Sequence, residues 1–90
     1  MTFDQILAGV KEEIAATLNL TASEITDERL LVADLGAESI DFIDLTFRLE
    51  QRFRLEIPEG ELFESTEPPA MTLTVGAVAA YLFNKLTPAS

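Results

Sequence analysis

The sequence predicts an all-α domain, a bundle of three main helices and one short helix, with a long loop between the first two. Three stretches of the 90-residue chain repeat their apolar residues at helical spacing. Residues that favour helix ends stand at the borders of these stretches. A hydrophobic content of 48% supports one modest core and leaves no room for a second. We therefore expect residues 1–90 to form a single domain.

The first helix is expected over residues 3–18. Thr2 and Gln5 stand three residues apart at its start, as in a capping box, and Asn19, which tolerates a left-handed conformation, follows its end. Its apolar residues recur at helical spacing: Phe3, Ile6, Leu7, Val10, Ile14 and Leu18. This pattern predicts an amphipathic helix with one face toward the core.

Residues 20–37 are expected to form a long connecting loop, because Thr and Asp residues interrupt any regular period. The loop is nevertheless rich in apolar side chains, namely Leu20, Ile25, Leu30, Leu31, Val32 and Leu35. These are too many to leave in water. We therefore expect the loop to lie across the helices and to contain a short helical turn.

The second helix is expected over residues 39–53 and has two apolar stripes. At 100° per residue, one stripe consists of Phe42, Leu45, Leu49 and Phe53, and the other of Ile40, Ile43 and Phe47. The first stripe is the expected core contact. A wider core contact is one interpretation of the second stripe, and a surface for partners is the other. Asp44 and Arg48 stand four residues apart in the order that favours an ion pair.

A short third helix is predicted to begin at Pro58 and to include Leu62 and Phe63, because proline suits the first turn of a helix. Gly60 weakens this helix. The stretch 64–73 contains a double proline and predicts an extended loop. This loop either adds a contact surface or is a tolerated surface insertion.

The last helix is expected between Thr74, which can cap it, and Pro88, which cannot continue it. Its predicted buried stripe consists of Val75, Val78, Ala79, Leu82 and Leu86. Lys85 lies in the last turn, where a cation complements the helix dipole.

Composition and charge exclude several classes of function. With 6 Lys and Arg against 16 Asp and Glu, the net charge of −10 disfavours nucleic acid and anionic membranes and favours partners with basic patches. The chain has no cysteine or histidine for a nucleophile or a transition-metal site, no EF-hand spacing and no glycine-rich nucleotide loop. We expect neither an enzyme nor a metal site. No apolar run is long enough to span a membrane and no secretory signal follows Met1, so we expect a cytoplasmic protein.

The stretch from Asp34 to Leu45, Asp-Leu-Gly-Ala-Glu-Ser-Ile-Asp-Phe-Ile-Asp-Leu, resembles the attachment site of acyl carrier proteins. The family pattern is Asp-Leu-Gly-Ala-Asp-Ser-Leu followed by an amphipathic helix, and only Glu38 and Ile40 depart from it. The match continues without a gap to Pro58. The resemblance implies a four-helix acyl-carrier-like bundle. It also implies that Ser39 carries 4′-phosphopantetheine, joined to its oxygen from coenzyme A by a phosphopantetheinyl transferase.

The position of Ser39 suits this chemistry. A hydroxyl near a helix N-terminus lies close to unpaired N–H groups and to the positive end of the dipole, which suits a phosphate ester. A serine there can also simply cap the helix. The resemblance further implies that the thiol of the attached group holds acyl intermediates as thioesters for fatty-acid, lipid or related biosynthesis. A peptidyl or polyketide carrier and an unmodified acidic helical interaction module are the alternatives.

The resemblance also implies a docking surface for acyl-transferring and condensing enzymes with basic patches. Its residues would be the acidic Glu38, Asp41, Asp44, Glu50 and Glu56 and the apolar Ile40, Ile43 and Phe47. The apolar stripe would also line the entrance to a pocket for the acyl chain. Three arginines, Arg48, Arg52 and Arg54, interrupt the acidic pattern of the family. A monomer is expected.

Overall fold

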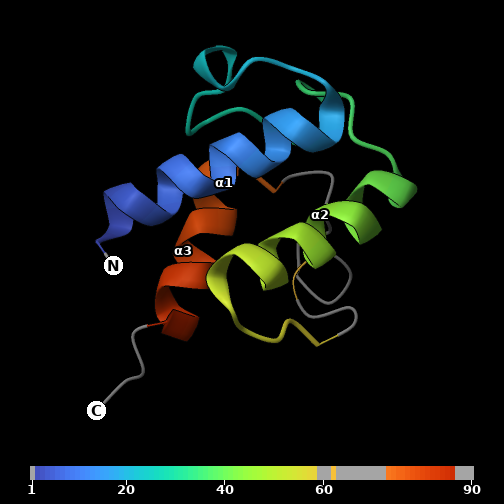
Figure 1. The fold of residues 1–90 in the computed structure, drawn as a ribbon. Helices are drawn as coiled ribbons and strands as arrows, with labels where there is room; N and C mark the ends of the chain where they lie inside the picture. Colours follow the sequence, from blue (N-terminus) through green and yellow to red (C-terminus); the bar gives the residue numbers. More distant parts are fainter. Residues whose placement is uncertain (1, 59–61, 63–72, 87–90) are drawn as a thin grey trace.

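The computed structural model describes residues 2–58, 62 and 73–86, and this part of the chain is all-helical as predicted. It contains α1 (Phe3–Leu18), the short 3-10 helix η1 (Ala22–Glu24), α2 (Ser39–Phe53) and α3 (Val75–Leu86). In Figure 1, α2 runs back in the opposite direction to α1, while α3 crosses α1 steeply. The central helix of this arrangement is α1, because it packs against both α2 and α3.

Three sequence predictions concern residues that lie mostly outside the part of the chain that the structure describes. The short helix expected from Pro58 to Phe63 lies outside the described part, apart from Pro58 and Leu62. The same holds for the loop expected over 64–73, apart from its last residue, and for the helix stop at Pro88. The four-helix arrangement therefore stays a prediction, while three of its helices are present.

Both ends of α1 form as the sequence predicts. The Gln5 backbone N–H donates to Thr2 Oγ1 at 3.2 Å, and the Thr2 backbone N–H donates to Gln5 Oε1 at 2.9 Å. This reciprocal pair is the predicted capping box. Asn19 ends the helix at φ 60°, in the left-handed region that asparagine tolerates.

The segment between α1 and α2 is held against the start of α3. Its backbone forms three hydrogen bonds with that end, from Leu31 N to Leu73 O at 3.1 Å, from Val75 N to Arg29 O at 3.0 Å and from Gly76 N to Asp27 O at 2.8 Å. Thr74 Oγ1 accepts from the Ala77 N–H at 3.1 Å, which confirms the predicted cap. The first N–H groups of α3, which have no partner inside the helix, are thus satisfied.

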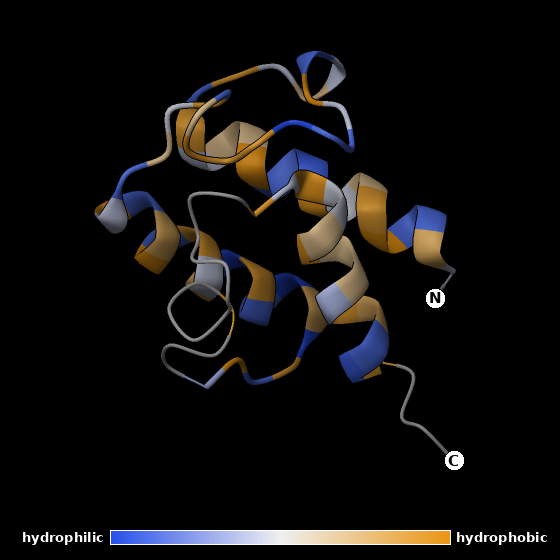
Figure 2. Ribbon diagram, turned by 180° about the vertical axis from the view of Figure 1, so that it is seen from behind, coloured by the Kyte–Doolittle hydropathy of each residue, from blue (hydrophilic) through white to orange (hydrophobic). Residues whose placement is uncertain are grey.

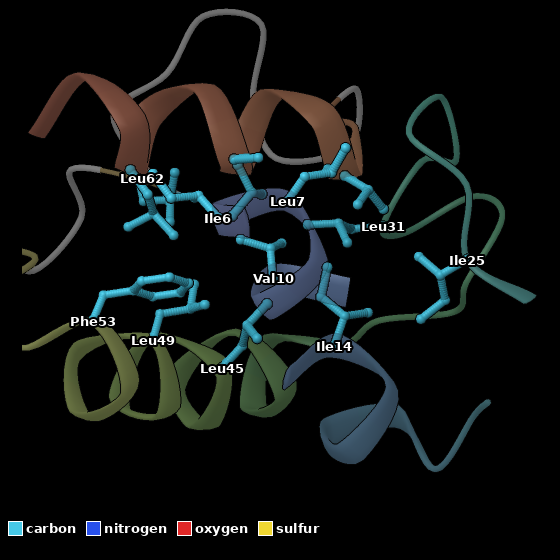
Figure 3. Packing of buried hydrophobic residues seen from close by; sticks show 14 of the residues in the cluster. Ile6, Leu7, Val10, Ile14, Ile25, Leu31, Leu45, Leu49, Phe53 and Leu62 are labelled. Carbon is cyan, nitrogen blue, oxygen red and sulfur yellow. The ribbon is translucent and has the colours of Figure 1, made fainter. Parts of the chain in front are cut away.

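One hydrophobic core joins the three helices and this segment. Figure 3 shows its side chains pointing toward one another from α1, from α2 and from the loop residues Ile25 and Leu31. Its buried members on the helices are Ile6, Leu7, Val10, Ile14, Ala15, Leu45, Leu49, Phe53, Val75, Val78, Ala79 and Leu82. Hydrophobic residues also recur along the linking segment in Figure 2. The predicted core stripes and the apolar loop packing are therefore confirmed.

The ends of the predicted stripes are less buried than their centres. Phe42, Leu18 and Leu86 are half-buried, and Leu20, Leu30, Val32 and Leu35 are half-buried in the loop. Phe3 is 36% exposed, and its ring meets Phe83 edge-on with centroids 5.8 Å apart. This contact ties the first turn of α1 to the last turns of α3. In the described part of the chain, no helix is long and apolar enough to span a membrane.

The helices α1 and α2 approach closely at Gly9. A Cβ atom on this residue would lie 2.8 Å from both Arg52 Nε and Phe53 Cζ. Real Cβ contacts are not this short, so a larger residue would displace the side chains of Arg52 and Phe53. The lack of a side chain at Gly9 therefore leaves room on α1 for these two side chains from the last turn of α2.

Candidate functional site

The turn that leads into α2 is fixed by its own hydrogen bonds. The Asp34 carboxylate accepts from the Leu30 N–H at 2.8 Å. Further along the turn, Gly36 N donates to Val32 O at 3.0 Å and Ala37 N donates to Leu31 O at 2.9 Å. The Ala37 side chain is buried in the core. The residues just before Ser39 therefore have a defined position, because both their backbone and a side chain are anchored.

Gly36 has φ +76°, a left-handed conformation that residues with a Cβ adopt at a cost. A Cβ atom would meet nothing within 4 Å, so the backbone angle alone requires glycine here. We expect Gly36→Ala to lower the free energy of unfolding by about 1–2 kcal/mol in urea denaturation followed by circular dichroism. Asparagine tolerates this region better than alanine, so Gly36→Asn should lose less. Equal stability of Gly36→Ala and the wild type would contradict this account.

Ser39 is the first residue of α2 and is exposed. The N-cap position belongs to Glu38, which is extended at φ −114° and ψ 173°. Its backbone N–H donates to Asp41 Oδ2 at 2.8 Å. The interpretation that Ser39 caps the helix is therefore wrong, since Glu38 and Asp41 cap it. Within the described residues, the Ser39 hydroxyl makes no hydrogen bond.

The start of α2 offers a favourable environment for a phosphate ester on Ser39. The backbone N–H groups of Asp41 and Phe42 bond to Glu38 O, at 2.9 Å and 3.2 Å. Those of Ser39 and Ile40 have no acceptor among the described residues, as expected for the first turn of a helix. Free N–H groups and the positive end of the helix dipole both attract an anionic oxygen. The residues at this helix start therefore fit an attached phosphate group.

The second apolar stripe of α2 faces solvent. Ile40 is 72% exposed, Ile43 is 73% exposed and Phe47 is 59% exposed. The interpretation of this stripe as a wider core contact is therefore wrong. The three side chains form an apolar face that starts beside Ser39 and continues for two turns along the helix. Exposed large hydrophobic side chains in one row are typical of interaction surfaces.

The acidic residues expected at the docking surface divide into two groups. Glu38, Asp44 and Glu56 are exposed. Asp41 and Glu50 are half-buried and already bind backbone N–H groups, Asp41 that of Glu38 and Glu50 that of Ile57 at 2.9 Å. The latter bond holds the segment after α2 against the helix. Asp41 and Glu50 therefore have structural roles that were not predicted, although Glu38 and Asp41 have the spacing of a capping box.

An ion-pair network joins α2 to α1. Arg48 Nε pairs with Asp44 Oδ2 at 3.0 Å, which confirms the predicted pair within α2. The contacts with α1 were not predicted: Arg48 Nη1 lies 3.8 Å from Glu13 Oε1, Arg52 Nη1 lies 3.0 Å from Glu13 Oε2 and Arg52 Nη2 lies 2.8 Å from Glu12 Oε1. The hydrogen bond to Asp44 raises the pKa of Arg48, and that to Glu13 raises the pKa of Arg52. Both guanidinium groups therefore stay charged at any ordinary pH.

The third arginine, Arg54, ends α2 at φ 54° and is exposed. In the part of the chain that the structure describes, it has no ion pair. The same part contains no group of three His, Cys, Asp or Glu side chains placed to hold a metal ion.

Comparison with known proteins covers most of the chain. A family model described as the phosphopantetheine attachment site matches residues 8–82. An acyl carrier protein of an Exiguobacterium species is 40% identical over 86 residues, which are 96% of this chain and 100% of that protein. An acyl carrier protein of Wolinella succinogenes is 38% identical over 77 residues, or 86% of this chain and 92% of its relative. The matched region contains all of α2 and its preceding turn.

Proposed function

This chain belongs to the acyl carrier protein family, whose domain carries a covalently attached 4′-phosphopantetheine, and on that premise we propose that Ser39 is the attachment residue. The single observation that supports this most strongly is the position of Ser39, an exposed residue at a helix start whose hydroxyl makes no hydrogen bond within the described residues. The family sequence pattern around Ser39 supports the same residue.

The attachment chemistry needs little from the chain itself. The Ser39 oxygen attacks the phosphorus next to the pantetheine of coenzyme A, a phosphodiester forms, and the nucleotide leaves as the diphosphate bond breaks. The hydroxyl proton would pass to a base of the transferase, since this chain has no histidine to accept it. The attached group supplies the thiol on which acyl groups travel as thioesters. The chain's own residues hold the hydroxyl in solvent, within reach of another enzyme's active site.

We further propose that the apolar face of α2 and the exposed carboxylates beside it bind partner enzymes. Ile40 and Ile43 would fill an apolar pocket of the partner enzyme near its active site. Glu38 and Asp44 would meet basic side chains of the partner at the edge of that pocket. This combination supports weak, fast and salt-dependent binding, which suits a carrier that visits one enzyme after another. In this proposal the protein acts as a monomer of one domain and catalyses no reaction itself.

The proposed pathway is fatty-acid or related lipid biosynthesis, with acyl-transferring and condensing enzymes as partners. The acyl carrier proteins to which the chain is similar over nearly its whole length support this over a peptidyl or polyketide carrier. An unmodified interaction module is the other alternative. It would use the same apolar face and would have no need of the Ser39 hydroxyl.

The test is loading of the purified apo-protein. Incubation with coenzyme A, magnesium and a broad-specificity phosphopantetheinyl transferase should add the mass of one phosphopantetheine to the intact protein. Carrier function requires this addition, whereas an interaction module does not. If the folded protein gained no mass under conditions that load a known carrier, the proposed function would be contradicted.

The same assay tests the apolar face. Truncation of Ile43 to alanine should raise the KM of the transferase for this protein by about tenfold and leave kcat nearly unchanged, since exposed apolar anchors contribute above about 1 kcal/mol to docking. Ile43 is 73% exposed, so stability should change little. Gln51→Ala, an exposed site at the far end of α2, is the control and should leave KM unchanged. An equal KM for both variants would show that the apolar face does not dock the transferase.

A further inference from the structure

Five charged side chains alternate in sign across the junction of α1 and α2. In order they are Asp44, Arg48, Glu13, Arg52 and Glu12, with neighbouring charges 2.8 to 3.8 Å apart. We infer that Glu12 and Glu13 of α1 strengthen the docking of basic partners to α2, because they neutralise Arg48 and Arg52 and so keep the docking face acidic. This inference rests on the proposed function and assigns a role to residues on a helix that does not itself carry the site.

Glu13 is the centre of the network. Its side chain is 18% exposed, against 37% for Arg52, 40% for Arg48 and 57% for Glu12. Its two carboxylate oxygens lie near different arginines, Oε1 at 3.8 Å from Arg48 and Oε2 at 3.0 Å from Arg52. A half-buried carboxylate between two cations is screened less by salt than an exposed pair. Glu13 therefore compensates the positive charges of both arginines at once.

The Arg52 side chain extends toward α1. Its Nε atom passes so close to Gly9 that a Cβ there would lie 2.8 Å away. Glu12 and Glu13 follow Gly9 by three and four residues and therefore lie on the same side of α1. The Arg52 side chain therefore packs over Gly9, where there is no side chain in its way, and pairs with the two glutamates.

The network leaves one negative charge, since three carboxylates face two guanidinium groups. Without Glu12 and Glu13, Asp44 alone would face both cations, and this part of α2 would become positive. Arg48 directly follows Phe47 of the apolar face and already pairs with Asp44, a carboxylate of the proposed docking surface. A basic partner would then meet like charge beside the apolar face, which weakens docking.

The experiment measures transferase kinetics on apo-protein variants, with coenzyme A in excess and at low ionic strength. E12Q/E13Q should raise the KM for the protein by about threefold to tenfold at unchanged kcat. The control E24Q/E28Q removes the same number of charges from exposed residues of the segment between α1 and α2, and should change KM less. Near 1 M salt, where the screening length is about 3 Å, the two variants should become equal.

A rescue variant separates charge from structure. The variant that carries R48Q and R52Q together with E12Q/E13Q also lacks the ion-pair network, but it has no unpaired cations. Its KM should therefore return to the wild-type value or below. Thermal unfolding of each variant reports whether it is folded at the assay temperature. If E12Q/E13Q does not fold, Glu12→Gln alone should give a smaller KM increase, since Glu12 is the more exposed partner of Arg52.

Failure of this inference differs from failure of the proposed function. A wild type that is never loaded contradicts the proposed function. A wild type that is loaded, with the KM of E12Q/E13Q no higher than that of E24Q/E28Q, overturns the inference alone. A raised KM that R48Q and R52Q do not restore also overturns it, because the effect would then come from the lost connection between helices and not from exposed cations.

Discussion

Replacement of Ser39 by alanine is expected to abolish loading with phosphopantetheine completely. The change removes the only atom that attacks coenzyme A in the proposed reaction. Ser39 is exposed, and its hydroxyl makes no hydrogen bond with the described residues, so the fold should lose less than about 0.5 kcal/mol. Intact mass after treatment with transferase and coenzyme A should equal that of the untreated variant, while circular dichroism should match the wild type.

Ser23 provides a matched control for this experiment. It is an exposed serine in η1, so it offers a second accessible hydroxyl in a short helical segment. Ser23→Ala should be loaded as fully as the wild type. Loading of Ser39→Ala would mean that another hydroxyl is the attachment site, and the role proposed for Ser39 would be lost.

Truncation of Leu49 to alanine should lower the free energy of unfolding by about 3 kcal/mol. Leu49 is fully buried in the core between α2 and α1. The loss combines the transfer energy of the removed carbon atoms with the cost of the cavity that remains. A domain of this size has a total stability of about 5–10 kcal/mol, so the variant would keep only a small margin. Urea denaturation followed by circular dichroism measures this difference.

Phe47→Ala is the contrast on the same helix. It removes more atoms than Leu49→Ala, but Phe47 is 59% exposed, so the expected cost is about 1 kcal/mol or less. The two variants therefore separate the buried stripe of α2 from its apolar face. A larger loss for Phe47→Ala than for Leu49→Ala would show that the apolar face is packed in solution and not free for partners.

Local signals predicted the helices well. The bounds of α1 and α2 follow from apolar spacing and from end signals such as the Thr2 and Gln5 capping box, which depend on residues three or four apart. The first stripe of α2 was recognised as core for the same reason. The apolar content of the segment between α1 and α2 alone predicted that it packs against the helices. Its hydrogen-bond partners at the start of α3 depend on tertiary contacts and could not be predicted.

Spacing could not decide how the second stripe of α2 is used. A period of 3.6 residues shows which side chains share a face, but not what covers that face. Ile40 and Ile43 were compatible with burial or exposure until the positions of α1 and α3 were known. In the fold of this chain α1 packs against the other side of α2, so the second stripe stays in solvent.

The charged residues were the least predictable part of the site. Asp44 and Arg48 are four residues apart, so their pair follows from helix geometry. Arg52 and Glu13 are 39 residues apart, and only the packing of α2 on α1 brings them together. Ser39 was a reasonable cap by residue type, but the cap is Glu38, whose N–H bonds to Asp41. The bond from the Glu38 N–H to Asp41 has the three-residue spacing of a capping box, whereas the bond from the Ile57 N–H to Glu50 spans seven residues and follows no such pattern.

The attachment residue can be identified directly by peptide mapping. Trypsin cleaves after Arg29 and Arg48 and releases residues 30–48, in which Ser39 and Thr46 are the hydroxyl-bearing residues. After loading of the wild-type protein, this peptide should carry the mass of one phosphopantetheine, and fragmentation should locate it on Ser39. Modification of Thr46, of any other peptide, or of none would contradict the account.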